Sequence, residues 1–191
     1  MKKVVLGSVL LLAMSSVHAA ESPRWDSAAL SYQSADLDGD KLNGFGLSGS
    51  KLLGTNVFVS GSYSSVSDKE YGVNWDYNTM SLGLGYRTAL TQNTDFFGVV
   101  SYEDVELEAS SGGFSDSGSE NGYGLAVGVR SMLTDKFELN GGFKYIDIAE
   151  ESDTALSVGA LYNFTNQFSA GVGITKSDDI DTVSVSAVYY F

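Results

Sequence analysis

Hydrophobic and polar residues alternate along most of this chain, and the alternation is most regular near its C-terminal end. In the segment 181–191, positions 182, 184 and 186 carry hydroxyl groups, and the odd positions after 181 hold Val183, Val185, Ala187, Tyr189 and Phe191. Side chains point alternately to the two faces of a strand. The segment therefore predicts a strand with one apolar face and one hydroxyl-bearing face.

The same alternation recurs upstream, and each run is bounded by residues that favour turns. Each run is about as long as a tilted strand that crosses a bilayer, which needs roughly 9–11 residues. Ten such runs occur, at 27–36, 41–51, 56–66, 76–89, 95–108, 121–133, 136–148, 154–164, 167–176 and 181–191. If two of the runs are loops, the alternative is eight strands.

The connections between the runs alternate in character. One set is short, at 52–55, 90–94, 134–135 and 165–166; the other is longer and acidic, at 37–40, 67–75, 109–120, 149–153 and 177–180. Barrels of outer membranes have short periplasmic turns and longer outer loops. Both ends of the barrel segment then lie on the periplasmic side, which requires an even number of strands.

The composition of the two faces decides between a soluble and a membrane protein. The large apolar residues share one face of each run, while the opposite face carries mainly Ser and Gly and few long charged side chains. A water-soluble barrel or sandwich places its large residues inside. We therefore predict an all-β fold, a closed antiparallel up-and-down transmembrane β-barrel whose apolar face contacts lipid.

Aromatic residues on the apolar face are expected to form belts at the two membrane interfaces. The sequence predicts a phenylalanine level beside the short turns and a tyrosine level nearer the acidic loops. The first comprises Phe96, Phe137, Phe164, Phe168 and Phe191, and the second Tyr32, Tyr63, Tyr102, Tyr123 and Tyr145.

The N-terminal segment predicts the compartment. Lys2 and Lys3 precede an apolar run that ends in the small residues around Ala19, which is the layout of a secretory signal peptide. We expect residues 1–20 to be this signal and residues 21–191 to be one barrel domain. The formal net charge of −13 argues against nucleic-acid binding, which needs a basic surface.

The alternating strands, the signal peptide and the terminal Tyr189-x-Phe191 resemble the small outer-membrane β-barrel superfamily, which includes the OmpA transmembrane domain and the Ail/OmpX and opacity-type barrels. Such proteins end in a recognition strand for the barrel-assembly machinery. Ser184, Tyr189 and Phe191 match its pattern, and Ser186 stands where glycine is usual. The resemblance implies a cell outer membrane location in a Gram-negative bacterium, lipid and lipopolysaccharide neighbours, and roles from structural barrel through narrow pore to adhesin.

Catalytic side chains are scarce. Cysteine is absent and the single histidine, His18, lies in the expected signal peptide. Nucleophilic catalysis that relies on Ser-His, Cys-His or Asp-His pairs is therefore excluded beyond residue 20. We predict no enzyme, no cofactor and no dedicated metal site.

Five charged residues fall on the polar face of their runs and are expected to form a charge network in the lumen: Arg87, Glu103, Arg130, Glu138 and Lys144. If the 134–135 turn centres near 134, Arg130 and Glu138 lie directly opposite each other. Charges in a narrow barrel require partners. The network is either a structural plug or a constriction that selects ions.

The outer loops hold most of the acidic residues. Asp36, Asp38 and Asp40 resemble the start of a calcium loop, but Lys41 and Leu47 stand where that loop needs Gly and Glu. We expect either a diffuse Ca²⁺ and Mg²⁺ atmosphere that bridges to lipopolysaccharide or simply solvated loops. The functional hypotheses are thus a structural barrel with a narrow polar lumen, a pore for ions or small solutes, and a surface-interaction protein.

Overall fold

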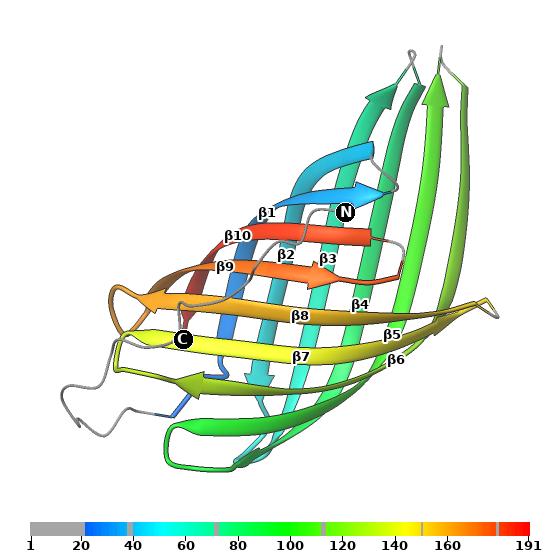
Figure 1. Ribbon diagram of the computed structural model, residues 1–191. Helices are drawn as coiled ribbons and strands as arrows, with labels where there is room; N and C mark the ends of the chain where they lie inside the picture. Colours follow the sequence, from blue (N-terminus) through cyan, green and yellow to red (C-terminus); the bar gives the residue numbers. More distant parts are fainter. Residues whose placement is uncertain (1–21, 38–39, 71–72, 112–113, 150, 179) are drawn as a thin grey trace, which may run out of the picture.

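Ten strands and no helix make up the described part of the computed structural model, which covers residues 22–37, 40–70, 73–111, 114–149, 151–178 and 180–191 (Figure 1). The expected signal peptide, 1–20, and Asp38 lie outside these residues. The strands are β1 (Ser27–Leu37), β2 (Asp40–Leu52), β3 (Val57–Glu70), β4 (Val73–Ala89), β5 (Thr94–Ser111), β6 (Phe114–Met132), β7 (Phe137–Ile148), β8 (Glu151–Asn163), β9 (Phe168–Lys176) and β10 (Ile180–Tyr190).

Every strand pairs antiparallel with its neighbours in sequence, and the sheet closes on itself. The first and last strands, β1 and β10, pair from Ser27 opposite Tyr190 to Leu37 opposite Ile180. This ladder removes both sheet edges within the barrel wall. The prediction of ten strands in an up-and-down barrel is therefore confirmed, and the alternative of eight strands is wrong.

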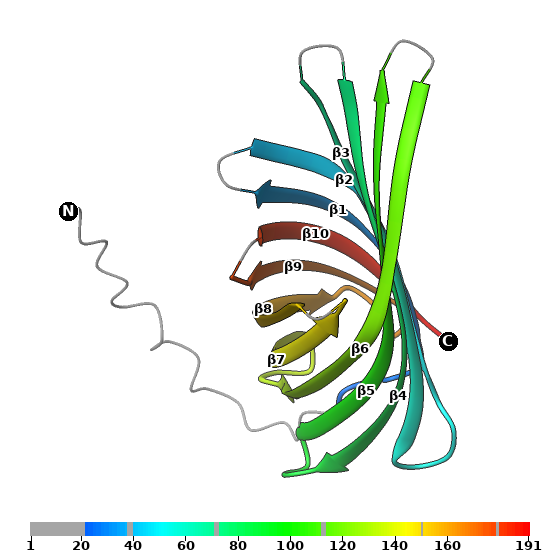
Figure 2. The ribbon, with the colours of Figure 1, turned by 90° about the vertical axis from the view of Figure 1, so that its right-hand side faces the viewer.

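The two ends of the barrel differ in height. The end with the short connections, here called the turn end, is compact, whereas β3 to β6 rise well beyond their neighbours at the other end, the hairpin end (Figures 1 and 2). There the β3–β4 pairing reaches Glu70 and Val73. The β5–β6 pairing continues to Ser111 and Phe114, although β6 and β7 separate beyond Gly122.

The height of β5 and β6 at the hairpin end corrects one expectation from the sequence. The segment 109–120 was expected to be one of the longer acidic connections, but most of it belongs to β5 and β6. Its small and polar residues lack the apolar alternation that marks a strand. The paired backbone of the neighbouring strands extends the ladder regardless of that composition.

The polarity of the wall is inverted relative to a soluble protein. Large apolar side chains point outward and are exposed, as Leu84, Val158 and Val172 are, while Phe58 points inward and is buried. Ser and Gly occupy many of the inward positions between them. Among the residues that the structure describes, none lies in a helix long and apolar enough to span a membrane.

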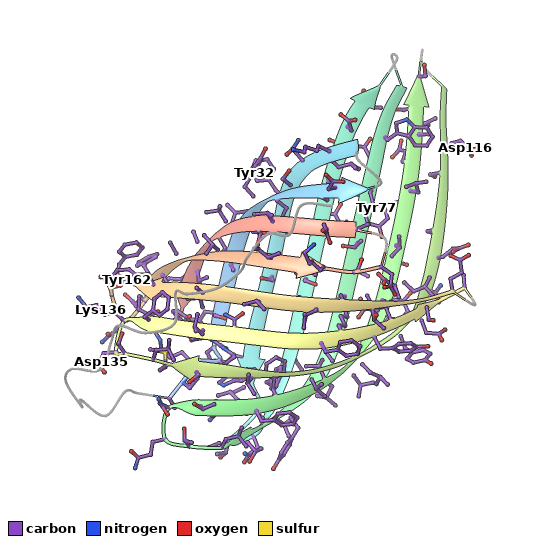
Figure 3. The ribbon with its side chains drawn as sticks, in the orientation of Figure 1. Tyr32, Tyr77, Asp116, Asp135, Lys136 and Tyr162 are labelled. Atoms are coloured by element: carbon purple, nitrogen blue, oxygen red, sulfur yellow. The ribbon has the colours of Figure 1, made fainter. Side chains whose placement is uncertain are left out.

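Outward aromatic residues gather near both ends of the wall, but the two levels are not of one residue type. Tyr162 packs edge-on against Phe164 at the turn end, with ring centroids 5.1 Å apart, and Figure 3 shows Tyr162 on the same side as Asp135 and Lys136. Toward the hairpin end, Tyr32 packs against Phe45 at 5.5 Å. The expected separation of phenylalanine from tyrosine is therefore wrong, because both rings suit an interface.

Two inward glycines permit close approach of neighbouring backbones near the hairpin end. A Cβ atom on Gly122 would stand 1.8 Å from the carbonyl oxygen of Asp147, and one on Gly44 would stand 1.8 Å from that of Ser65. A backbone carbonyl in a ladder cannot move aside as a flexible side chain can. These positions therefore accept only glycine without a shift of the sheet.

We predict that Gly122→Ala lowers the free energy of unfolding by about 1–3 kcal/mol, the usual cost of overpacking. Gly118→Ala is the control, since it lies on the same strand and has no atom within 4 Å of its added Cβ. Urea unfolding of the protein in phospholipid vesicles measures both. Equal effects of the two substitutions would contradict the close-approach argument.

Candidate functional site: the interior of the barrel

An aromatic cluster occupies the interior at the turn end. Trp25, from the segment that precedes β1, lies 4.5 Å from Phe58 and 5.5 Å from Phe97 between ring centroids. Trp25 is 5% exposed and Phe58 2%. The inward positions Gly85 and Gly128 provide the space for the phenylalanine rings, because a Cβ there would stand 2.3 Å from Phe58 and 2.5 Å from Phe97.

Two ion pairs surround this cluster. Arg87 donates to Asp95 at 2.7 Å, and the indole N–H of Trp25 donates to the same Oδ2 atom, also at 2.7 Å. Arg130 binds Glu138 through two hydrogen bonds of 2.7 and 3.1 Å, and its guanidinium carbon lies 4.8 Å from the Trp25 ring centroid. The carboxylates of Asp95 and Glu138 are only 1% exposed, so each depends on its arginine for compensation.

The segment 22–26 is fixed to the rim by charged side chains on both sides of Trp25. Arg24 donates to the side chain of Asn163 at 2.8 Å and to the backbone oxygen of Asn166, and it stacks 3.8 Å from the Tyr190 centroid. Asp26 accepts from Lys51 and from the backbone N–H of Leu52. These contacts hold the short segment across the turn end.

The anchor at Asp26 depends on pH. The hydrogen bond from Lys51 and the Leu52 backbone N–H hold the pKa of the Asp26 carboxyl below its ordinary value. The folded state therefore favours the carboxylate. This contribution is present at pH values above the ordinary pKa and is lost as the pH falls through the lowered one.

A separate polar group lies farther along the lumen. Oε1 of Glu103 accepts from Lys144 at 2.8 Å, from Ser81 at 3.0 Å and from Ser101. Glu103 is buried, whereas Lys144 keeps about a third of its side chain exposed. The pair thus faces open space on one side.

Two cavities lie toward the ends of the barrel, one of about 420 Å³ at the turn end and a second of about 340 Å³ near the hairpin end. Trp25 and Arg87 line the first. The second is bounded by Glu103 and Lys144 together with apolar residues of opposite walls, among them Val105 of β5 and Ile180 of β10. The two hollows lie on either side of the central lumen.

The five charged residues predicted for the lumen fall into two groups. Arg130 and Glu138 belong to the turn-end group with Arg87, and Glu103 and Lys144 form the other pair. Arg130 does not lie directly opposite Glu138: the ladder pairs it with Asn140, because the turn centres one residue later than supposed. The two side chains meet diagonally instead.

Sequence reasoning missed Trp25, Phe58, Phe97 and Asp95. Strict alternation backward from Glu103 would have placed Phe97 and Asp95 inside, since they share its face of β5. Phe58 shares the face of the β3 serines in the same way. No periodic signal marked Trp25, which lies outside any strand.

A closed sheet with an apolar outer wall and a polar interior defines a transmembrane β-barrel. The model of the family described as "Outer membrane protein beta-barrel domain" matches residues 6–191. The chain belongs to this family and is a protein of the outer membrane, which confirms the resemblance noted from its sequence. The turn end is therefore periplasmic and the hairpin end extracellular.

Two solved structures with TM-scores above 0.5 agree in fold. The NanC porin superposes with a TM-score of 0.54 and 8% identity over 85% of this chain and 99% of that one. The translocator domain of autotransporter NalP from Neisseria meningitidis has a TM-score of 0.52 and 14% identity over 86% of this chain and 87% of that one. Ail, the attachment invasion locus protein of Yersinia pestis, has a TM-score of 0.46 and 16% identity over 86% of this chain and 94% of that one. No curated protein matches the chain by sequence.

We predict that Glu138→Gln lowers the free energy of unfolding by about 3–5 kcal/mol, because it leaves Arg130 buried without a counter-charge. Asp181→Asn is the control: its partner Lys176 and Asp181 itself are largely exposed, and such pairs contribute about 0–1 kcal/mol. Equilibrium unfolding in urea checks both. Similar losses for the two variants would refute the role assigned to burial.

Proposed function

We propose that this protein is a structural barrel of the outer membrane whose lumen is closed at the periplasmic end by its own N-terminal segment. The observation that carries the proposal is the position of Trp25 between Phe58 and Phe97, with its indole N–H bonded to the buried Asp95. A buried aromatic ring of this size excludes water from the space it fills. In each of the two arginine–carboxylate pairs beside it, the arginine binds its carboxylate. Neither pair therefore presents a free charge that would attract a permeant ion.

A narrow pore is the second candidate, and one feature favours it. The lumen beyond the aromatic cluster is lined by small side chains such as Gly46, Gly171 and Ser184, and a hollow lies at each end. If the segment 22–26 leaves the mouth, ions gain a path between these hollows. The anchors of Arg24 and Asp26 are at the rim and partly exposed, so they are the contacts that such an opening would break first.

No enzymatic role is proposed. The chain beyond residue 20 has neither histidine nor cysteine. The buried carboxylates Asp95 and Glu138 are each held by an arginine, and neither is presented to a substrate. A catalytic carboxylate would need a pKa near the working pH and access to the reacting group.

Partners of the barrel follow from its wall and its loops. We propose that outer-membrane lipid and lipopolysaccharide cover the apolar wall, and that Tyr189 and Phe191, both exposed and outward, act as the signal for the barrel-assembly machinery. Around the acidic extracellular strands we propose a diffuse Ca²⁺ and Mg²⁺ atmosphere. Among the described residues there is no group of three or more His, Cys, Asp or Glu side chains that could hold a metal ion.

The closure by Trp25 is tested by conductance. Purified wild-type protein in planar lipid bilayers is expected to show little or no channel activity, because Trp25 fills the mouth. Trp25→Ala is expected to open steps of measurable conductance. Trp75→Ala serves as the control, since Trp75 is exposed on the extracellular part of β4.

Three outcomes would speak against a lumen closed by Trp25. Open channels in the wild type favour the pore instead. If Trp25→Ala shows no channel activity while circular dichroism shows a folded barrel, another part of the lumen closes the path for ions. Equal conductance of the Trp25 and Trp75 variants shows a general loosening of the barrel.

A further inference from the structure

We propose that the cavity at the extracellular end binds a small organic cation with an apolar body. This inference goes beyond the structural role, because a barrel closed at its periplasmic mouth needs no ligand at the other end. The cavity of about 340 Å³ is bounded by strands β3 to β8 and by β10, so it lies inside the upper lumen. Figure 3 shows Tyr77, one of its lining residues, in this region below the β5–β6 tip that Asp116 marks.

Apolar side chains form a large part of the walls of the cavity. Val105, Ile146 and Ile148 line it from β5 and β7, and Tyr77 and Ile180 line it from the opposite side. Tyr77 and Ile180 also pack on a small buried cluster of Ala35, Leu42 and Val66. Val105, Ile146 and Ile148 are only half-buried, so they keep apolar surface that a ligand would remove from water.

The charge of the cavity is negative. Its charged lining consists of Glu103, Glu120, Glu151 and Asp153 against the single cation Lys144. Lys144 is already bound to Glu103 at 2.8 Å. Three carboxylates therefore remain without a cation from the lining, and they attract positive ligands and repel negative ones.

The apolar walls and the negative charge of the cavity together favour an organic cation over a metal ion as its ligand. A hydrated metal ion gains nothing from isoleucine and valine side chains, and the described residues include no group of three or more His, Cys, Asp or Glu side chains that could hold one. A ligand with one ammonium group and a single ring or short branched body satisfies both parts of the lining. Its size also suits the cavity, which is at the small end of the roughly 300–1,000 Å³ typical of ligand sites.

The test uses three probes of similar size and different charge: benzyltrimethylammonium, benzyl alcohol and benzenesulfonate. Binding is measured by saturation-transfer difference NMR on the full barrel domain in phosphatidylcholine nanodiscs at low salt, and empty nanodiscs give the background from lipid partitioning. We expect saturable binding of the cation, binding of the alcohol weaker by about tenfold, and no binding of the sulfonate. A neutral probe that binds as tightly as the cation, or a preferred sulfonate, would overturn the proposal, as would the absence of any saturable signal.

Two matched double variants locate the site. Glu120→Gln with Asp153→Asn removes two carboxylates of the cavity and is expected to weaken cation binding by about tenfold. Asp104→Asn with Glu106→Gln removes the same charge from β5 positions that alternate with Glu103 and Val105 and so face outward. An equal loss in the second variant would mean attraction to the overall negative charge and would overturn the assignment of a site.

A third variant tests the apolar wall. Ile146→Thr keeps a β-branched residue, which suits the strand, but replaces part of the apolar contact with a hydroxyl. We expect several-fold weaker binding of benzyltrimethylammonium with an unchanged circular dichroism spectrum. Unchanged affinity would show that the apolar wall does not contact the ligand and would overturn the proposal. Because none of these variants touches Trp25, their outcome is independent of the conductance test.

Discussion

The absence of water in hydrocarbon imposes one constraint from which the structure follows: every backbone N–H and C=O in the wall must bind another strand. The ladder between β1 and β10 satisfies this constraint by joining the first strand to the last. Once the sheet is closed, its outer face must be apolar, and the inner face is free to carry polar groups. The exposed Leu84 and Val172 outside and the serines and glycines inside are both consequences of that closure.

Closure creates a second requirement in the interior. A narrow lumen cannot solvate charges fully, so Asp95 and Glu138 each lie against an arginine, and Glu103 lies against Lys144. Trp25 fills the remaining space at the periplasmic end, with its ring beside Arg130 and its N–H on Asp95. Packing and charge pairing therefore depend on each other there. At the extracellular end the lumen is lined by apolar side chains and excess carboxylates instead, which makes the two ends chemically different.

The alternation of side chains predicted the strands because burial in a barrel wall has a period of two, and a slip by one residue would reverse every face. It therefore also predicted Arg130 and Glu138 as lumen residues. It did not predict which charges pair: Arg87 binds Asp95, whose inward position followed from the alternation of β5 but was overlooked beside the turn. Trp25 was missed because its contacts are made with residues far away in the chain. The height of β5 and β6 was missed because hydrogen bonding to a neighbouring strand, rather than apolar pattern, extends them.

The central claim is that the apolar face of the sheet contacts lipid and the hydroxyl-bearing face encloses the lumen. Since the chain contains no cysteine, single cysteines carrying nitroxide labels can be placed at Val158, Val172 and Val185, and at Ser157 and Ser184 for comparison. Electron paramagnetic resonance in vesicles then measures collisions with oxygen, which concentrates in lipid, and with a water-soluble nickel complex. The account predicts high oxygen and low nickel accessibility at the three valines and low oxygen accessibility at the two serines. The reverse pattern would place the valines in a protein core and contradict the membrane architecture.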